Sequence, residues 1–151
     1  MTSPVPSGTG YDLPIGVNQP GWCADNDIYL SPGSYSPVYF YTSLSSANWP
    51  AGMPFSLGKI AQVNWMFNNL GLWGMSFTSI TDSQGLQIQD AVWEILCPPF
   101  QAPTGSLAES MANAASTHST YMPMTGGWAA VIMAVNDLPA KFQLVFTVVD
   151  P

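Results

Sequence analysis

The chain has 151 residues, of which 47% are hydrophobic and only 7% are charged, and its formal net charge is −7. This length predicts one domain with a sizeable buried core. Lys59 and Lys141 are the only cationic side chains apart from one histidine, so the chain cannot neutralise a phosphate backbone. Nucleic-acid binding is thereby excluded, and anionic membrane surfaces are disfavoured as partners.

No apolar stretch approaches the length of a membrane span; the longest, 128–135, suits a buried strand. A weakly charged surface rich in Trp and Pro favours an extracellular wall, matrix or polymer, where neighbours cover much of the surface. Residues 1–20 are rich in Pro, Gly, Ser and Thr and are predicted to form an extended arm. They lack the charged start and apolar stretch of a signal peptide. Residues 21–151 are predicted to form a single globular domain.

The first half of that domain predicts two strands and then a helix. Residues 22–30 carry the first cysteine and then alternate in polarity, and residues 38–41 are rich in β-forming side chains. In the segment 57–70, apolar residues recur at helical spacing, which predicts an amphipathic helix ending near Gly71.

The second half predicts two further helices and two strands. The segment 86–96 is a helix candidate that must end before Pro98. The segment 107–115 is a shorter one, with Ser106 as its N-cap and Glu109 at the capping-box position. Residues 128–135 and 142–149 read as strands, the last with clean alternation. The expected fold class is α+β, an antiparallel β-barrel or sandwich with a helical insertion in the middle.

Gln89 is the polar residue that most needs an explanation. On a helical wheel of 86–96, Gln89 falls within the apolar arc, while Asp90 and Glu94 share the opposite side. A buried carboxamide is costly unless it is hydrogen-bonded. From the residue pattern alone, we expect Gln89 to bond the backbone of an adjacent strand.

Two short segments resemble those of a known class of protein. Gln89-x-Ala91-Val92-Trp93 is similar to the Gln-x-Ala-aliphatic-Trp motif of the thioester domains on bacterial surface adhesins. Trp22-Cys23-x-Asp25 resembles their aromatic-Cys-x-acid motif. Secreted surface proteins with a PEP-CTERM sorting tail have a similar layout, including a closing strand like 143–151. The resemblance covers roughly residues 21–151.

This resemblance implies an internal thioester between Cys23, the acyl acceptor, and Gln89, the acyl donor, formed with loss of ammonia. Trp22 and Trp93 would shield the bond from water. A primary amine on a host or neighbouring surface would attack the Gln89 carbonyl and free Cys23. Such single-turnover chemistry would not make the protein an enzyme, and it implies no cofactor.

Cys97 is a rival partner for Cys23, because two cysteines in a secreted domain are read first as one disulfide. On the wheel Cys97 lies about 80° around from Gln89, so one position of Cys23 should not serve both partners. The main alternative is therefore a purely structural subunit of an extracellular filament or surface layer, held by a Cys23–Cys97 disulfide. Thioester and disulfide both stay open at this point.

Three weaker signals remain. Asp25 and Asp27 alternate as the carboxylates of calcium-binding loops do. The segment lacks the glycine and the distal glutamate of an EF-hand, so the two carboxylates are better interpreted as turn caps, and no metal site is predicted. Trp49 and Trp73 would be the candidates for a carbohydrate-binding platform, a third and weaker hypothesis. His118 is read as a loop residue, because nothing fixes an acid partner for a catalytic triad.

These inferences predict an adhesive or self-assembling protein of the cell surface or extracellular matrix. Its partners would be amines on a host or neighbouring cell, or copies of itself in a homopolymer. No membrane span is expected.

Overall fold

The computed structural model describes residues 21–26, 38–135 and 141–149. Within them the strands form one antiparallel sheet of four, in the order β1-β4-β3-β2. Two long strands lie at its centre, β3 (Trp128–Val135) and β4 (Lys141–Val148), and the shorter β1 (Gly21–Cys23) and β2 (Val38–Thr42) lie at its edges. The apolar run 128–135 is thus a central strand, as predicted.

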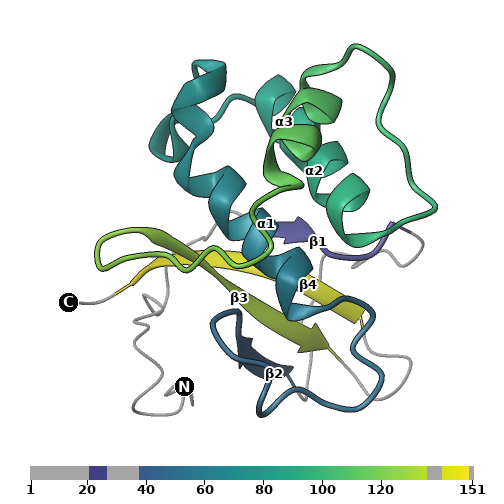
Figure 1. The fold of residues 1–151 in the computed structure, drawn as a ribbon, viewed down its shortest axis with the longest axis vertical. Coiled ribbons are helices and arrows are strands. Elements are labelled where there is room, and N and C mark those ends of the chain that lie inside the picture. The colour runs from purple at the N-terminus through teal and green to yellow at the C-terminus, as the bar shows by residue number, and fades with distance from the viewer. Residues whose placement is uncertain (1–20, 27–37, 136–140, 150–151) are drawn as a thin grey trace.

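Between β2 and β3 the chain forms three α-helices and two short 3₁₀ turns. The helices are α1 (Leu57–Asn68), α2 (Asp82–Leu96) and α3 (Leu107–Ala115), and the turns are η1 (Leu70–Trp73) and η2 (Phe77–Ser79). The helices lie together on one side of the sheet, with α1 against β3 and α2 against β1 (Figure 1). The predicted α+β class and the helical insertion are therefore confirmed.

The finer prediction of a closed barrel is wrong, and the strands in the described residues form no sandwich. The described strands form a single open sheet, in which β1 and β2 stand at opposite edges and do not pair with each other. The helices take the place of a second sheet on the face that they cover, where they bury its apolar residues. Alternation along a strand reveals that one face is buried, but not whether a helix or another strand buries it.

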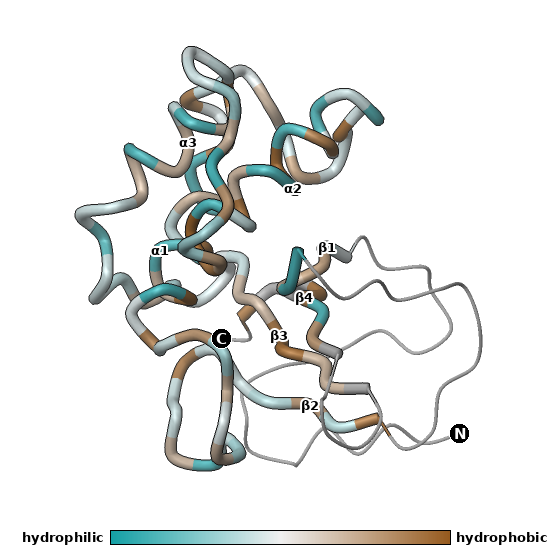
Figure 2. Tube along the Cα trace, turned by 90° about the vertical axis from the view of Figure 1, so that its right-hand side faces the viewer, coloured by the Kyte–Doolittle hydropathy of each residue, from teal (hydrophilic) through white to brown (hydrophobic). Residues whose placement is uncertain are grey.

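Alternation divides the apolar residues of the sheet between two clusters. Ile132 and Leu144 oppose each other across β3 and β4 and face the helices, whereas Ala129 and Val131 belong to a smaller cluster on the other face. In the side view, the trace of β3 lies mostly in the hydrophobic half of the colour scale, with the helices on one side of it (Figure 2). Phe67 of α1 and Ile88 of α2 are among the fully buried side chains there.

Helix α1 is also joined to the sheet by two asparagine side chains. Beyond Thr42 the strand β2 ends, so Trp128 and Ala130 of β3 have no strand beside them on that side. Asn68 pairs with Trp128 instead: its Nδ2 donates to the Trp128 carbonyl at 2.7 Å, and its Oδ1 accepts from the Trp128 N–H at 2.8 Å. Asn64 accepts from the Ala130 N–H at 2.8 Å. Carboxamides on a helix thus replace missing strand partners.

The predicted elements differ from the observed ones mainly at their ends. Helix α2 begins at Asp82, four residues before the predicted start at Leu86, because Thr81 and Gln84 form a capping box. Helix α3 has its predicted bounds and its Ser106 cap. Strand β1 ends at Cys23, and the rest of the predicted segment 22–30 lies outside the described residues from position 27 on, as does the arm 1–20.

Candidate functional site

The site that the two motifs predict lies at the edge of the sheet, where α2 meets β1. The Ala24 N–H donates to the Phe142 carbonyl of β4 at 3.1 Å. In an antiparallel ladder the next residue along the strand points its N–H and C=O the other way. The backbone polar groups of Cys23 therefore face outward from β4, at the open edge of the sheet.

Gln89 occupies that edge. The Cys23 N–H donates to Oε1 of Gln89 at 2.9 Å, and Nε2 of Gln89 donates to the Cys23 carbonyl at 2.9 Å. The predicted hydrogen bond between Gln89 and an adjacent strand is confirmed. The strand residue is Cys23, so the structure also brings together the two residues that the motifs single out.

The side chain of Cys23 lies on the face of the sheet opposite to the one that the helices cover. Side chains alternate along a strand, and Trp22 points into the helix-facing core, so the Cys23 side chain belongs to the opposite face. The Cys23 side chain is half-buried. Its rotation about the Cα–Cβ bond decides how closely the sulfur approaches the Gln89 carboxamide.

Cys97 lies close by, at the C-cap of α2. Its Sγ donates to the Ala24 carbonyl at 3.3 Å, one residue beyond Cys23. No disulfide joins the two cysteines in the structure. Gln89 and Cys97 of the α2 segment thus contact neighbouring residues, Cys23 at the end of β1 and Ala24 directly after it.

The two tryptophans predicted to shield the site have different surroundings. Trp22 is buried, and its ring packs edge-on against Phe67 at a centroid distance of 4.8 Å, while its Nε1 donates to the Gly85 carbonyl at 3.3 Å. Trp93 is half-buried, lies one helical turn beyond Gln89 and packs against Phe100 at 5.4 Å. The buried Nε1 of Trp93 has no hydrogen-bond partner among the described residues.

A groove with a volume of about 700 Å³ opens beside Gln89. One wall comes from the segment 77–81, which includes η2, and the other from the first two turns of α2. Gly21 and Trp22 of β1 also line it. Gln89 is therefore reachable from this side, whereas Cys23 is not among the lining residues.

The acidic side chains of α2 near the site are not fully solvated. Burial raises the pKa of the Asp90 carboxyl above its ordinary value. Glu94 Oε2 accepts from the Ala102 N–H at 3.1 Å and so anchors the connection between α2 and α3. Both were predicted to lie on a solvated helix face, but both are half-buried.

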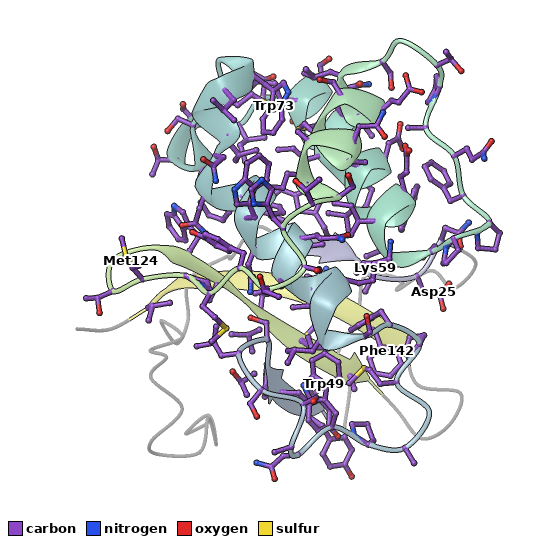
Figure 3. All side chains as sticks on the ribbon, viewed as in Figure 1. Asp25, Trp49, Lys59, Trp73, Met124 and Phe142 are labelled. Atoms are coloured by element: carbon purple, nitrogen blue, oxygen red, sulfur yellow. The ribbon has the colours of Figure 1, made fainter. Side chains whose placement is uncertain are left out.

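The weaker candidates do not gather into a site. Across residues 21–26, 38–135 and 141–149, no three His, Cys, Asp or Glu side chains are grouped to hold a metal ion, and Asp27 lies outside these ranges. Trp49 and Trp73 lie at opposite ends of the molecule and cannot share one carbohydrate platform (Figure 3). His118 follows α3 and stacks on Trp65 at a centroid distance of 4.0 Å.

Sequence reasoning missed the groove and the way its wall is built. The groove depends on the early start of α2, which was signalled by Thr81 and Gln84 at capping-box spacing. The hydrogen bond between the Trp22 indole and α2 had no signal in the sequence, because it joins residues 63 positions apart.

No protein-family model, curated protein or solved structure matches the chain. The resemblance to thioester domains therefore rests on the residues of the two motifs. In the described part of the chain, no helix is both long and apolar enough to cross a membrane.

Proposed function

We propose that this chain is an extracellular surface or matrix protein that attaches covalently to amines through a thioester between Cys23 and Gln89. The observation that carries the proposal is the paired hydrogen bonding of the Gln89 carboxamide with Cys23 itself, at 2.9 Å in both directions. Positioning two groups together in this way replaces a bimolecular encounter by an intramolecular one.

The donor in one of these bonds suits acyl chemistry. When the Cys23 sulfur attacks Cδ of Gln89, negative charge develops on Oε1, the atom that already accepts the Cys23 N–H. A fixed backbone donor at this oxygen stabilises the tetrahedral intermediate, as in an oxyanion hole. The C–N bond then breaks, Nε2 departs as ammonia with the thiol proton, and the C–S bond remains.

The second step consumes the thioester. A primary amine attacks the same carbonyl, a C–N bond forms, the C–S bond breaks, and the amine proton returns to the sulfur. The groove supports this order of events, because it reaches Gln89 from the side of the helices. The sulfur belongs to the opposite face of the sheet, so nucleophile and leaving group do not compete for space.

Intact-protein mass spectrometry under non-reducing conditions tests the proposal. The expected result is a loss equal to one ammonia, which disappears in C23S and Q89A but persists in C97S and N68A. Methylamine should then add to Gln89 of the unsubstituted protein, of C97S and of N68A, but not to Gln89 of C23S. An unchanged mass for protein isolated without exposure to amines contradicts the proposal.

A second candidate is a structural subunit of a filament or surface layer, held by a Cys23–Cys97 disulfide. It is favoured by Asn68, which pairs with Trp128 just as Gln89 pairs with Cys23, so such a contact serves structure elsewhere in this molecule. The proximity of the Cys97 thiol to Ala24 also favours it. In the same mass measurement, a loss of two hydrogens that C97S abolishes would identify this alternative.

A further inference from the structure

The groove beside Gln89 is lined by an acidic and an apolar side chain of α2 in addition to Gln89 itself. Asp82, Leu86 and Gln89 lie at positions i, i+4 and i+7 of α2 and all three line the groove. These spacings place them along one face of the helix. At a rise of 1.5 Å per residue, Asp82 lies about 10 Å from Gln89 along the helix axis.

We propose that the groove selects amines that carry a second positive charge about 10 Å from the attacking nitrogen, across an apolar spacer. The attacking nitrogen would lie at Gln89, the methylene groups along Leu86, and the distal cation at Asp82. The proposal names the substrate class of the thioester site and rests on the proposed function for its chemistry. A polyamine and a lysine beside another basic residue share this pattern.

The charge distribution supports a cationic ligand. Asp82 is the one charged side chain among the residues that line the groove in the described parts of the chain. The net charge of the whole chain is −7, so the long-range field also attracts cations. Lys59 lines a separate cleft together with Glu94. No lysine of the described residues lines the groove, so no cationic side chain there competes with a cationic ligand.

The apolar part of the groove supports a methylene spacer. Leu86 is 67% exposed although it lies on a helix whose other large apolar residues are mostly buried. Phe77 and Ile80 line the groove across from it, so an alkyl chain can contact apolar atoms from both walls. Covering such surface contributes about 25 cal/mol per Å² removed from water.

The test measures binding without the covalent step. The C23S protein, which cannot form a thioester, is titrated with 1,8-diaminooctane and with 1-aminooctane, and amide NMR shifts report the site and the affinity. The diamine places its two nitrogens at about the required separation when extended. We expect it to bind about two- to fivefold more tightly than the monoamine, the range of an exposed ion pair.

Three substitutions in the C23S background assign the contacts. D82N should abolish the preference for the diamine, because the carboxamide carries no charge to pair with the distal ammonium. L86S should weaken both ligands, and L72S should weaken neither, although Leu72 is 68% exposed and so matches Leu86. Leu72 lies in η1 and does not line the groove.

Equal affinities for the two amines, or a preference that survives D82N, would overturn the inference. Shifts that map outside residues 21–22 and 77–89 would overturn it as well. These outcomes are independent of the proposed function, since the loss of ammonia is measured separately on the protein that retains Cys23. If the protein bound diamines selectively but never lost ammonia, the inference about the groove would stand and the proposed thioester would be refuted.

Discussion

At the scale of single residues, Gln89 and Asn68 form the same contact with different strands. Each carboxamide accepts the N–H and binds the C=O of one strand residue that lacks a neighbouring strand. What distinguishes Gln89 is the side chain of its partner, since Cys23 carries a thiol and Trp128 an indole. This pairing offers a matched comparison between a purely structural carboxamide and one beside a nucleophile.

The first prediction compares Q89A with N68A. In the C23S background, which retains the Gln89 carboxamide, Q89A removes two hydrogen bonds and N68A removes three. Each leaves a part-buried N–H and C=O without that partner, so each should lower the free energy of unfolding by about 1–3 kcal/mol. Urea unfolding followed by circular dichroism measures the loss. If Q89A alone left stability unchanged, the Gln89 contact would contribute nothing to the fold.

The second prediction concerns Asp90 and pH. Because burial raises the pKa of this carboxyl, the folded protein holds the proton more tightly than the unfolded chain. The contribution of Asp90 to stability is thus greatest at acid pH and is lost as pH rises through the raised pKa. Solvent screens this partly exposed carboxyl, so D90N should be more stable than the parent at pH 7 by no more than about 0.5 kcal/mol, and equal to it at pH 3. Thermal unfolding of both proteins at pH 7 and at pH 3 measures this difference in stability. A stability difference between D90N and the parent that is larger at pH 3 than at pH 7 would contradict the prediction.

At the scale of elements, the start of α2 determines the shape of the groove. Thr81 accepts the N–H of Gln84, and Gln84 Oε1 lies 2.9 Å from the Thr81 nitrogen. This capping box begins the helix early enough to bring Asp82 into line with Gln89. Without the first turn, one wall of the groove would be lost.

The third prediction uses T81A, with S106A of α3 as its match. Ser106 caps α3 through the N–H of Glu109 but does not line the groove. Each substitution should cost about 1 kcal/mol of stability. Only T81A should speed hydrogen exchange of the amides in the first turn of α2. Equal exchange in both variants would mean that Thr81 does not control this turn.

At the scale of the whole molecule, Phe67 joins the elements that surround the site. Its ring contacts Trp22 of β1 at 4.8 Å and Phe77 of η2 at 5.7 Å, and it is itself part of α1. It is also 2% exposed. The position of β1 relative to the helices therefore depends on this aromatic cluster as well as on the hydrogen bonds that join Trp22 and Cys23 to α2.

The fourth prediction is that F67A lowers the free energy of unfolding by about 3–5 kcal/mol, as large cavities in a core do. It should also reduce the fraction of protein that loses ammonia, because β1 would lose its aromatic packing and be held against α2 by hydrogen bonds alone. L72A, at an exposed position, should stay within about 0.5 kcal/mol of the parent in urea unfolding. A fall of less than 1 kcal/mol for F67A would show that the cluster does not hold the layers together.

Local patterns predicted most of the elements. The apolar spacing in 57–70, the Ser106 cap and the alternation in 142–149 each correspond to an observed element. These signals involve neighbours within one or two turns of the chain, so they can be read from the sequence. The early start of α2 was missed because the apolar pattern begins only at Leu86, one turn after the cap at Thr81.

The sequence by itself determined that Gln89 lies on an apolar helix face and needs a hydrogen-bonding partner, and that this chain has almost no cations. Only the tertiary structure decided that the partner is the Cys23 backbone, that the sheet is open, and that Asp82, Leu86 and Gln89 share a groove. The physical reason is separation along the chain. A helical face is set by residues three or four apart, whereas the edge that Gln89 covers is created by the pairing of β1 with β4, more than a hundred residues later.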